Sequence, residues 1–191
     1  MPMLSVIIAT LDCERPLALT LGTLVPGAVD GLVSEAIVAD GGSRDGSAIV
    51  ADAAGCGFVA VEGPLGRRLK TAAAKARAPF LLFLRPGIVL DAAWIGEARR
   101  FAERSAAAQC AAVLRRGAPS QTPLRELWTL LASALGALPR PDQGLLVARQ
   151  FYDVLGGHSE DAADSEADLI RRIGRRRLVT LAAAASPVVR F

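Results

Sequence analysis

An acidic residue that ends an apolar run and is followed at once by two glycines is the strongest sign of a binding site in this sequence. Asp40 follows the apolar run 35–39, and Gly41 and Gly42 come next. The run predicts a buried strand, and open α/β sheets bind ligands at the carboxyl ends of such strands. The glycines let the backbone turn sharply and leave room for a ligand. We therefore predict a nucleotide pocket at Asp40. The alternative is an ordinary strand–turn–helix in which a polar side chain only caps the helix.

The residues after the glycines give a second reason to expect an anionic ligand here. Ser43 or Asp45 is suited to cap a helix that begins near Gly46, and the free N–H groups of a helix N-terminus favour an anion. A second apolar run, 4–10, predicts another strand that leads to Asp12. Polar residues from two strand ends would then meet in one crevice.

Strands and helices alternate along the first half of the chain. The predicted elements, in chain order, are a strand over 4–10, a helix over 16–24, a strand over 35–39, a helix over 46–54, a strand over 57–61, a turn over 63–66, a helix over 67–77 and a strand over 80–84. This alternation predicts an α/β fold with a mostly parallel central sheet and helices on both faces. Residues 115–123 predict a flexible loop between a nucleotide-binding half, 1–114, and an acceptor half, 124–191, of a single domain, 1–191.

The composition fits this class of protein. A chain of 191 residues with 52% hydrophobic content can bury one large core, and a net charge of +3 is too small to indicate nucleic acid. The pI of 9.1 suits a phosphorylated substrate or an anionic membrane surface. Cys13, Cys56 and Cys110 are widely spaced, which favours a reduced, cytoplasmic protein without a disulfide or zinc site. The apolar residues 3–11 lack a basic leader, so they predict a strand rather than a signal peptide, and no later run has the length of a membrane span.

Two motifs resemble the family-two-type inverting glycosyltransferases of the GT-A fold. The stretch 5–13, SVIIATLDC, is similar to the family's opening SVIIPTLNE, and the stretch 40–47, DGGSRDGS, is similar to its DGGSTDGT. The resemblance implies transfer of a sugar from a nucleoside diphosphate donor to an acceptor, with inversion. It also implies that Asp12, Asp40 and Gly41 bind the base and ribose of the donor.

The basic stretch 66–70 resembles the family's GRARQ, which lies next to the donor nucleotide. Arg67 and Arg68 could both bind diphosphate oxygens from the first turn of their helix through charge-assisted hydrogen bonds. Arg67 is the better candidate of the two. The alternative is that the basic residues of this helix, Lys70 among them, form a solvated face.

The sequence departs from the family where the metal ligand should stand. After the strand 80–84 the family has D-x-D or FLHADT, whose last carboxylate holds a divalent metal, whereas this chain has Arg85-Pro86-Gly87. None of these three side chains offers an oxygen ligand to a hard cation. We therefore assign no metal ligand, leave a role for a divalent metal in doubt, and expect Arg85 to neutralise the diphosphate through two parallel bonds. Asp91 is the alternative metal ligand, although its position favours capping the next helix.

The second half of the chain contains three further stretches that resemble the family. The stretches 141–151 and 156–158 are similar to GDQ..FVRR..F and LGGF, which form a strand and helix start beneath the acceptor site, and 164–172 is similar to EDVDLSRR. His158, the one histidine of the chain, follows two glycines, and we expect it at the surface.

In the register of the last stretch, the resemblance implies that Glu166 is the general base. Such a carboxylate takes the proton of the acceptor hydroxyl as that hydroxyl attacks the anomeric carbon. Asp164 and Asp168 are the alternates. A competing interpretation is that these residues only form an acidic helix N-terminus, which the helix dipole favours.

Two functions therefore compete. The first is a glycosyltransferase acting on a nucleotide sugar and an unknown acceptor. The second is a degenerate member of the same fold that binds a nucleotide or a partner without turnover. A nucleotidyltransferase is disfavoured by the missing carboxylate, because phosphoryl transfer depends on Mg²⁺.

The acceptor and the location of the protein stay open. The leucines of 124–138 have helical spacing, which predicts a core helix. With the basic run 171–177 this helix could instead rest on the inner face of a membrane and meet a lipid-linked acceptor. The sequence does not indicate an oligomeric state.

Overall fold

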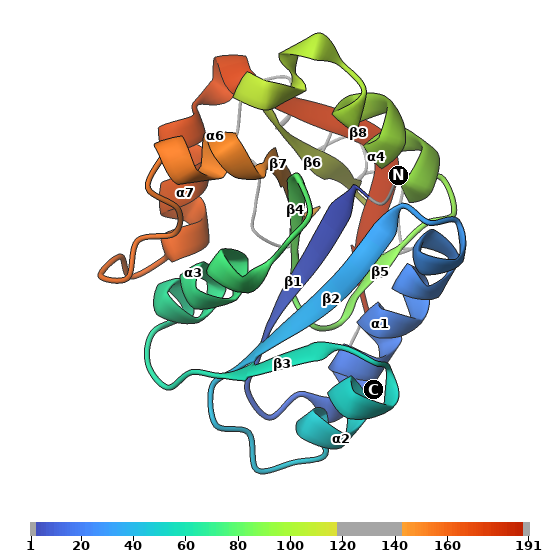
Figure 1. Ribbon diagram of the computed structural model, residues 1–191, viewed down its shortest axis with the longest axis vertical. Helices are drawn as coiled ribbons and strands as arrows, with labels where there is room; N and C mark the ends of the chain where they lie inside the picture. The colour runs from blue at the N-terminus through green and yellow to red at the C-terminus, as the bar shows by residue number, and fades with distance from the viewer. Residues whose placement is uncertain (1–2, 118–142, 189–191) are drawn as a thin grey trace, which may run out of the picture.

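The computed structural model describes residues 3–117 and 143–188, in which a single mixed sheet forms the centre (Figure 1). The strands are β1 (Leu4–Thr10), β2 (Val33–Asp40), β3 (Gly57–Ala60), β4 (Phe80–Leu84), β5 (Ile88–Leu90), β6 (Ala111–Arg116), β7 (Leu145–Ala148) and β8 (Leu178–Pro187). The α-helices are α1 (Glu14–Val29), α2 (Ser47–Ala53), α3 (Leu65–Lys75), α4 (Trp94–Ala102), α6 (Arg149–Val154) and α7 (Ser165–Ile173). Two short 3₁₀ helices are η1 (Ser105–Gln109) and η3 (Arg175–Arg177).

The sheet has the order β3-β2-β1-β4-β7-β6-β8-β5. Strands β3, β2, β1 and β4 are parallel, and β7 continues the sheet antiparallel to β4. Thr10 is opposite Asp40 and Ile8 is opposite Leu84, so the carboxyl ends of β1, β2 and β4 lie at the same edge. The structure thus confirms the predicted α/β fold with a mostly parallel central sheet.

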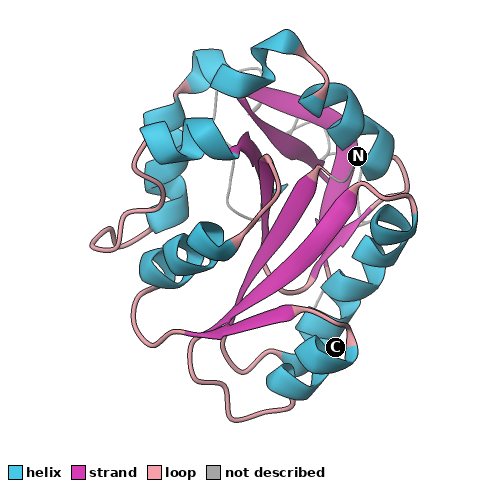
Figure 2. Cartoon of the chain, in the orientation of Figure 1, coloured by secondary structure: helices cyan, strands magenta, loops and turns pink. Residues whose placement is uncertain are grey.

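The central strands β1 and β4 consist mostly of apolar residues because both of their faces are buried. Val6, Ile7 and Ile8 of β1 have 0% exposure, and every residue of β4 is buried. Helices α1 and α2 lie on one side of these strands and α3, α6 and α7 on the other, so that helices surround the sheet (Figure 2). Strands covered on both faces need no polar alternation, which is why β1 and β4 could be located from the sequence.

Helices α1 and α3 differ from the prediction in their bounds. Helix α1 continues to Val29, whereas we expected it to end at residue 24. Pro26 lies inside it and has no N–H to donate to the preceding turn. Helix α3 begins at Leu65, not at Arg67, because Gly66 is buried in its first turn and only the lack of a side chain admits the carbonyl oxygen of Ser159.

The second half of the chain also corrects one boundary. Arg115 and Arg116 belong to β6 and are not part of the loop predicted over 115–123. The rest of that loop after Gly117, and the helix predicted over 124–138, lie outside the described residues. Strands β5 and β6, from the predicted nucleotide-binding half, pair with β8 from the other half, so the sheet runs through both.

Within the described residues, no helix is both long and apolar enough to span a membrane.

Candidate functional site

Asp40 lies at the carboxyl end of β2, as predicted, and its carboxylate accepts hydrogen bonds from neighbouring residues of the protein. Oδ1 accepts hydrogen bonds from Thr10 Oγ1 (2.9 Å) and Ser43 Oγ (2.5 Å), and Oδ2 accepts from the N–H groups of Gly42 and Ser43, both at 2.9 Å. Burial pushes the pKa of Asp40 up, but the bonds from Ser43, Gly42 and Thr10 outweigh it and lower the pKa below its ordinary value. A buried carboxylate with four donors holds the loop after β2 in one shape.

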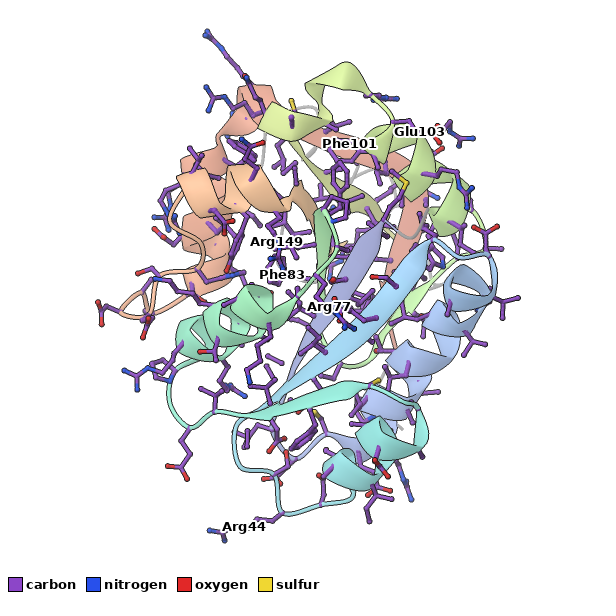
Figure 3. All side chains as sticks on the ribbon, viewed as in Figure 1. Arg44, Arg77, Phe83, Phe101, Glu103 and Arg149 are labelled. Atoms are coloured by element: carbon purple, nitrogen blue, oxygen red, sulfur yellow. The ribbon has the colours of Figure 1, made fainter. Side chains whose placement is uncertain are left out.

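The loop after β1 is fastened to the loop after β2 in the same way. Asp12, which has a positive φ of 48°, accepts a hydrogen bond from Arg44 N (2.7 Å), and its own N–H donates to Ser43 Oγ (2.9 Å). Arg44 itself extends outward from the tip of the loop after β2 (Figure 3). The side chain of Asp12 therefore joins two loops of the strand-end crevice and remains exposed to solvent.

The N-termini of α1 and α2 share their capping carboxylates. Asp45 accepts hydrogen bonds from Glu14 N (2.8 Å) and Ser47 N (3.0 Å), and Glu14 accepts one from Gly46 N (3.1 Å). We predicted Ser43 or Asp45 as the cap of the second helix, but its N-cap residue is Gly46, which forms no side-chain cap, and Asp45 binds the N–H of Ser47 in the first turn. The prediction that this helix offers free N–H groups to an anion is wrong at Gly46 and Ser47, because both already donate to carboxylates.

A cavity of about 520 Å³ opens beside these loops, at the carboxyl ends of β1 and β4. Its wall is formed by the ends of those strands, the first turns of α1 and α3, the start of α7 and the end of β8. Three charged side chains line it, namely Arg68, Arg85 and Glu166. The cavity thus collects groups from segments that are distant in the chain, from Ala9 to Val188, at the edge where α/β sheets bind ligands.

Arg85 and Glu166 meet directly at this cavity. Arg85 Nε lies 2.7 Å from Glu166 Oε2, and Arg85 Nη2 contacts the same oxygen. The Glu166 side chain is 11% exposed and that of Arg85 is 44% exposed, so the pair is accessible from the arginine side. The sequence predicted both residues for the site but not that they form an ion pair.

The two arginines at the start of α3 point to different places. Arg67 is exposed and its Nε donates to Glu160 Oε2 (3.0 Å), outside the cavity. Arg68 lines the cavity, and its Nη1 donates to the main-chain oxygen of Thr10 (2.8 Å). Sequence reasoning ranked Arg67 first, whereas the structure places Arg68 beside Arg85.

The residues at this edge do not fit a divalent cation. Gly87 has a φ of 85°, and its N–H donates to Thr20 Oγ1 and to the main-chain oxygen of Pro16. Asp91 is not part of the cavity wall. Its carboxylate accepts hydrogen bonds from Ala93 N and Ala184 N instead. Within residues 3–117 and 143–188, no group of three or more acidic, histidine or cysteine side chains could hold a metal ion. Glu166 is the one carboxylate among the residues that line the cavity, and Arg85 contacts it.

The alternates to Glu166 have local partners on α7. Asp164 is the N-cap of the helix, where its side chain accepts a hydrogen bond from Ala167 N (3.0 Å). Asp168 forms ion pairs with Arg171 and Arg172 one turn later. Neither lines the cavity with Arg85.

The expectation that His158 lies at the surface is wrong. It is 1% exposed and its ring packs edge-on against Phe83 of β4. Its main-chain N–H donates to Tyr152 Oη (3.1 Å), and the same hydroxyl is hydrogen-bonded to His158 Nδ1 at 2.9 Å. Burial lowers the pKa of His158 to about 3, and the charge of Arg172 acts in the same direction. The sequence signal for this inward turn was the glycine pair, since Gly156 and Gly157 both have positive φ.

Comparison by sequence finds no match for this chain, whereas comparison by fold finds similar solved structures. The sequence matches no family model and no curated protein. The fold is similar to that of glucosyl-3-phosphoglycerate synthase from Mycobacterium tuberculosis, with a TM-score of 0.72 at 19% identity over 99% of this chain and 73% of that one. The complex of that enzyme with Mn²⁺, UDP-glucose and phosphoglyceric acid gives 0.70 at 21% identity over 100% of this chain and 73% of that one. At these identities the similarity establishes the GT-A fold.

Proposed function

We propose that this protein is a glycosyltransferase that takes a sugar from a nucleoside diphosphate donor and transfers it, with inversion, to an acceptor. One observation carries the proposal: Arg85 and Glu166, 81 residues apart in the chain, meet at a cavity of about 520 Å³ at the carboxyl ends of β1 and β4. A cation for a diphosphate and a carboxylate for a proton are the two groups that this transfer requires. Enzymes of similar fold bind UDP and UDP-glucose, which supports a nucleotide sugar as donor.

In the proposed donor complex the nucleoside lies against the loops after β1 and β2. Asp12 is exposed there and Gly41 is proposed to contact the nucleoside through its main chain, whereas Asp40 acts first by shaping the loop. The diphosphate lies in the cavity at Arg85. Arg67, which the sequence favoured for the diphosphate, is paired with Glu160 outside the cavity, so the proposal assigns the diphosphate to Arg85 and not to Arg67.

The proposed chemistry moves one proton and exchanges one bond. The acceptor hydroxyl gives its proton to Glu166 while its oxygen forms a bond to the anomeric carbon. The bond from that carbon to the diphosphate oxygen breaks, and its electrons leave with the nucleoside diphosphate. Arg85 binds the negative charge that develops on the leaving group. No step is assigned to a metal ion, because the side chains at this edge do not fit one.

The acceptor is a separate part of the proposal. A neighbour of similar fold binds phosphoglyceric acid, so a small phosphorylated acceptor is one class to test. A lipid-linked acceptor at a membrane is the other class that the sequence suggests, and contact with a membrane stays a prediction. The division into a nucleotide-binding half, 1–114, and an acceptor half, 124–191, belongs to the same proposal.

The second candidate function is nucleotide binding without turnover. It is favoured by the ion pair itself, since the carboxylate proposed as base is held by Arg85. A carboxylate that stays bonded to a guanidinium is a poor proton acceptor.

Calorimetry with UDP, GDP and the matching nucleosides, followed by a transfer assay with labelled nucleotide sugars, tests both functions. We expect nucleoside diphosphate binding, and transfer to at least one class of acceptor. Arg85→Ala should weaken diphosphate binding about tenfold to a hundredfold and leave nucleoside binding unchanged, because a charged hydrogen bond is lost. Binding without transfer from any donor would favour the second function, and absence of binding would contradict both.

A further inference from the structure

Arg68 differs from the neighbouring arginines in having no carboxylate partner within the described part of the chain. Arg67 is paired with Glu160 and Arg85 with Glu166. Arg68 instead donates from Nη1 to the main-chain oxygen of Thr10, and its buried Nε has no hydrogen-bond partner among residues 3–117 and 143–188.

The cavity consequently carries an excess of positive charge. Two guanidiniums and one carboxylate are the charged groups in its wall. A half-buried guanidinium is costly to leave without a counter-charge, because burial removes part of its hydration. An anion in the cavity would supply that counter-charge.

The loop after β2 is shaped to accept this side chain. A Cβ atom at Gly41 would lie 2.6 Å from Arg68 Nη1 and 3.1 Å from its Cζ. The φ of Gly41 is not positive, so the backbone itself does not require glycine at this position. Glycine at 41 therefore makes room for the guanidinium, in contrast to Gly42, which has a φ of 97° and open space around it.

We infer that Arg68 is the second guanidinium of a diphosphate-binding pair with Arg85. The inference rests on the proposed function in taking the donor diphosphate as the ligand. Together the two side chains bring two positive charges to the cavity, as one divalent cation would. Arg68 is fixed by Thr10 and Gly41, and Arg85 reaches the diphosphate from the end of β4, so each guanidinium binds one phosphate.

The test compares Arg68→Ala with Arg67→Ala, which removes the same side chain one position away. Calorimetry in the presence of EDTA measures affinity for UDP, inorganic pyrophosphate and uridine. We expect Arg68→Ala to weaken UDP and pyrophosphate about tenfold to a hundredfold and to leave uridine unchanged, because the lost contacts are to phosphate. Arg67→Ala should change none of the three by more than about twofold, since its partner is the exposed Glu160.

Gly41→Ala provides a second variant that keeps every charge. Its methyl group would displace the Arg68 guanidinium, so it should weaken UDP and pyrophosphate in the same direction as Arg68→Ala. In an Arg68→Ala background the same change should have no further effect on either ligand. Thermal unfolding of each variant checks that the fold persists.

The outcomes separate this inference from the proposed function. If UDP binds the parent and Arg68→Ala equally well, the inference falls and the proposed function stands. If pyrophosphate binding depends on Arg68 but no nucleotide binds, the anion site stands and the proposed function falls. A loss with Arg67→Ala and none with Arg68→Ala returns the role to Arg67 and overturns the inference.

Discussion

The two sides of the strand-end crevice hold their charged groups by different kinds of partner. On the loop side, defined by Asp12, Asp40 and Asp45, the carboxylates accept hydrogen bonds from main-chain N–H groups of their own or the adjacent loop. On the cavity side, defined by Arg68, Arg85 and Glu166, the partners are a carbonyl oxygen and another charged side chain.

This difference separates groups that keep their partners from groups that can exchange them. A main-chain donor stays in place unless its loop unfolds, so the loop-side carboxylates stabilise backbone shape. The guanidinium of Arg85, on a side chain that is 44% exposed, can exchange a carboxylate for a phosphate, because both are oxygen anions that accept charge-assisted hydrogen bonds. The loop side therefore has a structural role, and the cavity side carries the proposed binding and chemistry.

Glu166→Gln should have the largest effect, and it falls on the cavity side. Loss of the proposed base is expected to slow transfer about 10²–10⁴-fold. The same change removes the carboxylate that holds Arg85, so UDP should bind about fivefold more tightly, which corresponds to roughly 1 kcal/mol. Transfer assays and calorimetry measure the two effects.

Glu160→Gln is the matched control, because it removes the partner of Arg67 in an ion pair outside the cavity. Neither transfer nor UDP affinity should change in that variant. Unchanged UDP affinity in Glu166→Gln would mean that Arg85 does not exchange partners. Retained transfer would move the role of base to Asp164 or Asp168, or remove it from α7.

Asp40→Ala tests whether the loop-side carboxylates stabilise the fold. Four donors lose a buried, charged acceptor, so the free energy of unfolding should fall by about 2–4 kcal/mol. Urea unfolding measures this change, with the exposed Asp52 of α2 replaced by alanine as the control. Nucleotide affinity should fall as well. Full stability combined with a loss of nucleotide binding would show that the carboxylate serves the ligand rather than the loop.

The two sides should also differ in their response to acid. The lowered pKa of Asp40 means that its contribution is complete at neutral pH and is lost only as the pH falls below about 4. His158, behind the cavity side, has its pKa lowered to about 3, so the unfolded chain takes up its proton below about pH 6.5 while the folded chain does not. Between pH 7 and pH 5 this histidine should reduce stability by about 2 kcal/mol.

Urea unfolding of the parent and of His158→Gln at several pH values checks this expectation. The variant should be less stable at pH 7 but should lose less stability between pH 7 and pH 5, because glutamine does not titrate. An equal loss in both proteins over this range would mean that His158 is already protonated in the fold.

The smallest effect is expected from divalent cations. UDP affinity should change by less than about twofold between Mn²⁺ and EDTA, because the side chains of residues 85–87 offer no oxygen ligand. Calorimetry at constant ionic strength measures this. A clear increase in affinity with Mn²⁺ that disappears in Asp91→Ala would restore a displaced metal site and give the cavity side a fourth charged group.

Local sequence determined the strands and the strand-end loop that form the base of the site. The runs 4–10 and 80–84 consist mostly of apolar residues, as is typical of strands covered on both faces in a helix-flanked sheet, so β1 and β4 could be located in advance. Asp40 is the last residue of β2 and the two glycines follow it directly, so their place at the strand end was also predictable. These features depend on neighbours in the chain.

The tertiary structure decided which charged groups meet. Neighbouring positions on a helix point about 100° apart, so burial of Gly66 and Leu69 fixed Arg68 toward the cavity and Arg67 toward Glu160. Residue types alone do not specify that rotation. Likewise, the pairing of Arg85 with Glu166 and the inward turn of His158 arise where α7 and the loop before it pack against β4 and α3. The sequence by itself determined where the crevice would form, and packing between distant segments determined which of its side chains line the cavity.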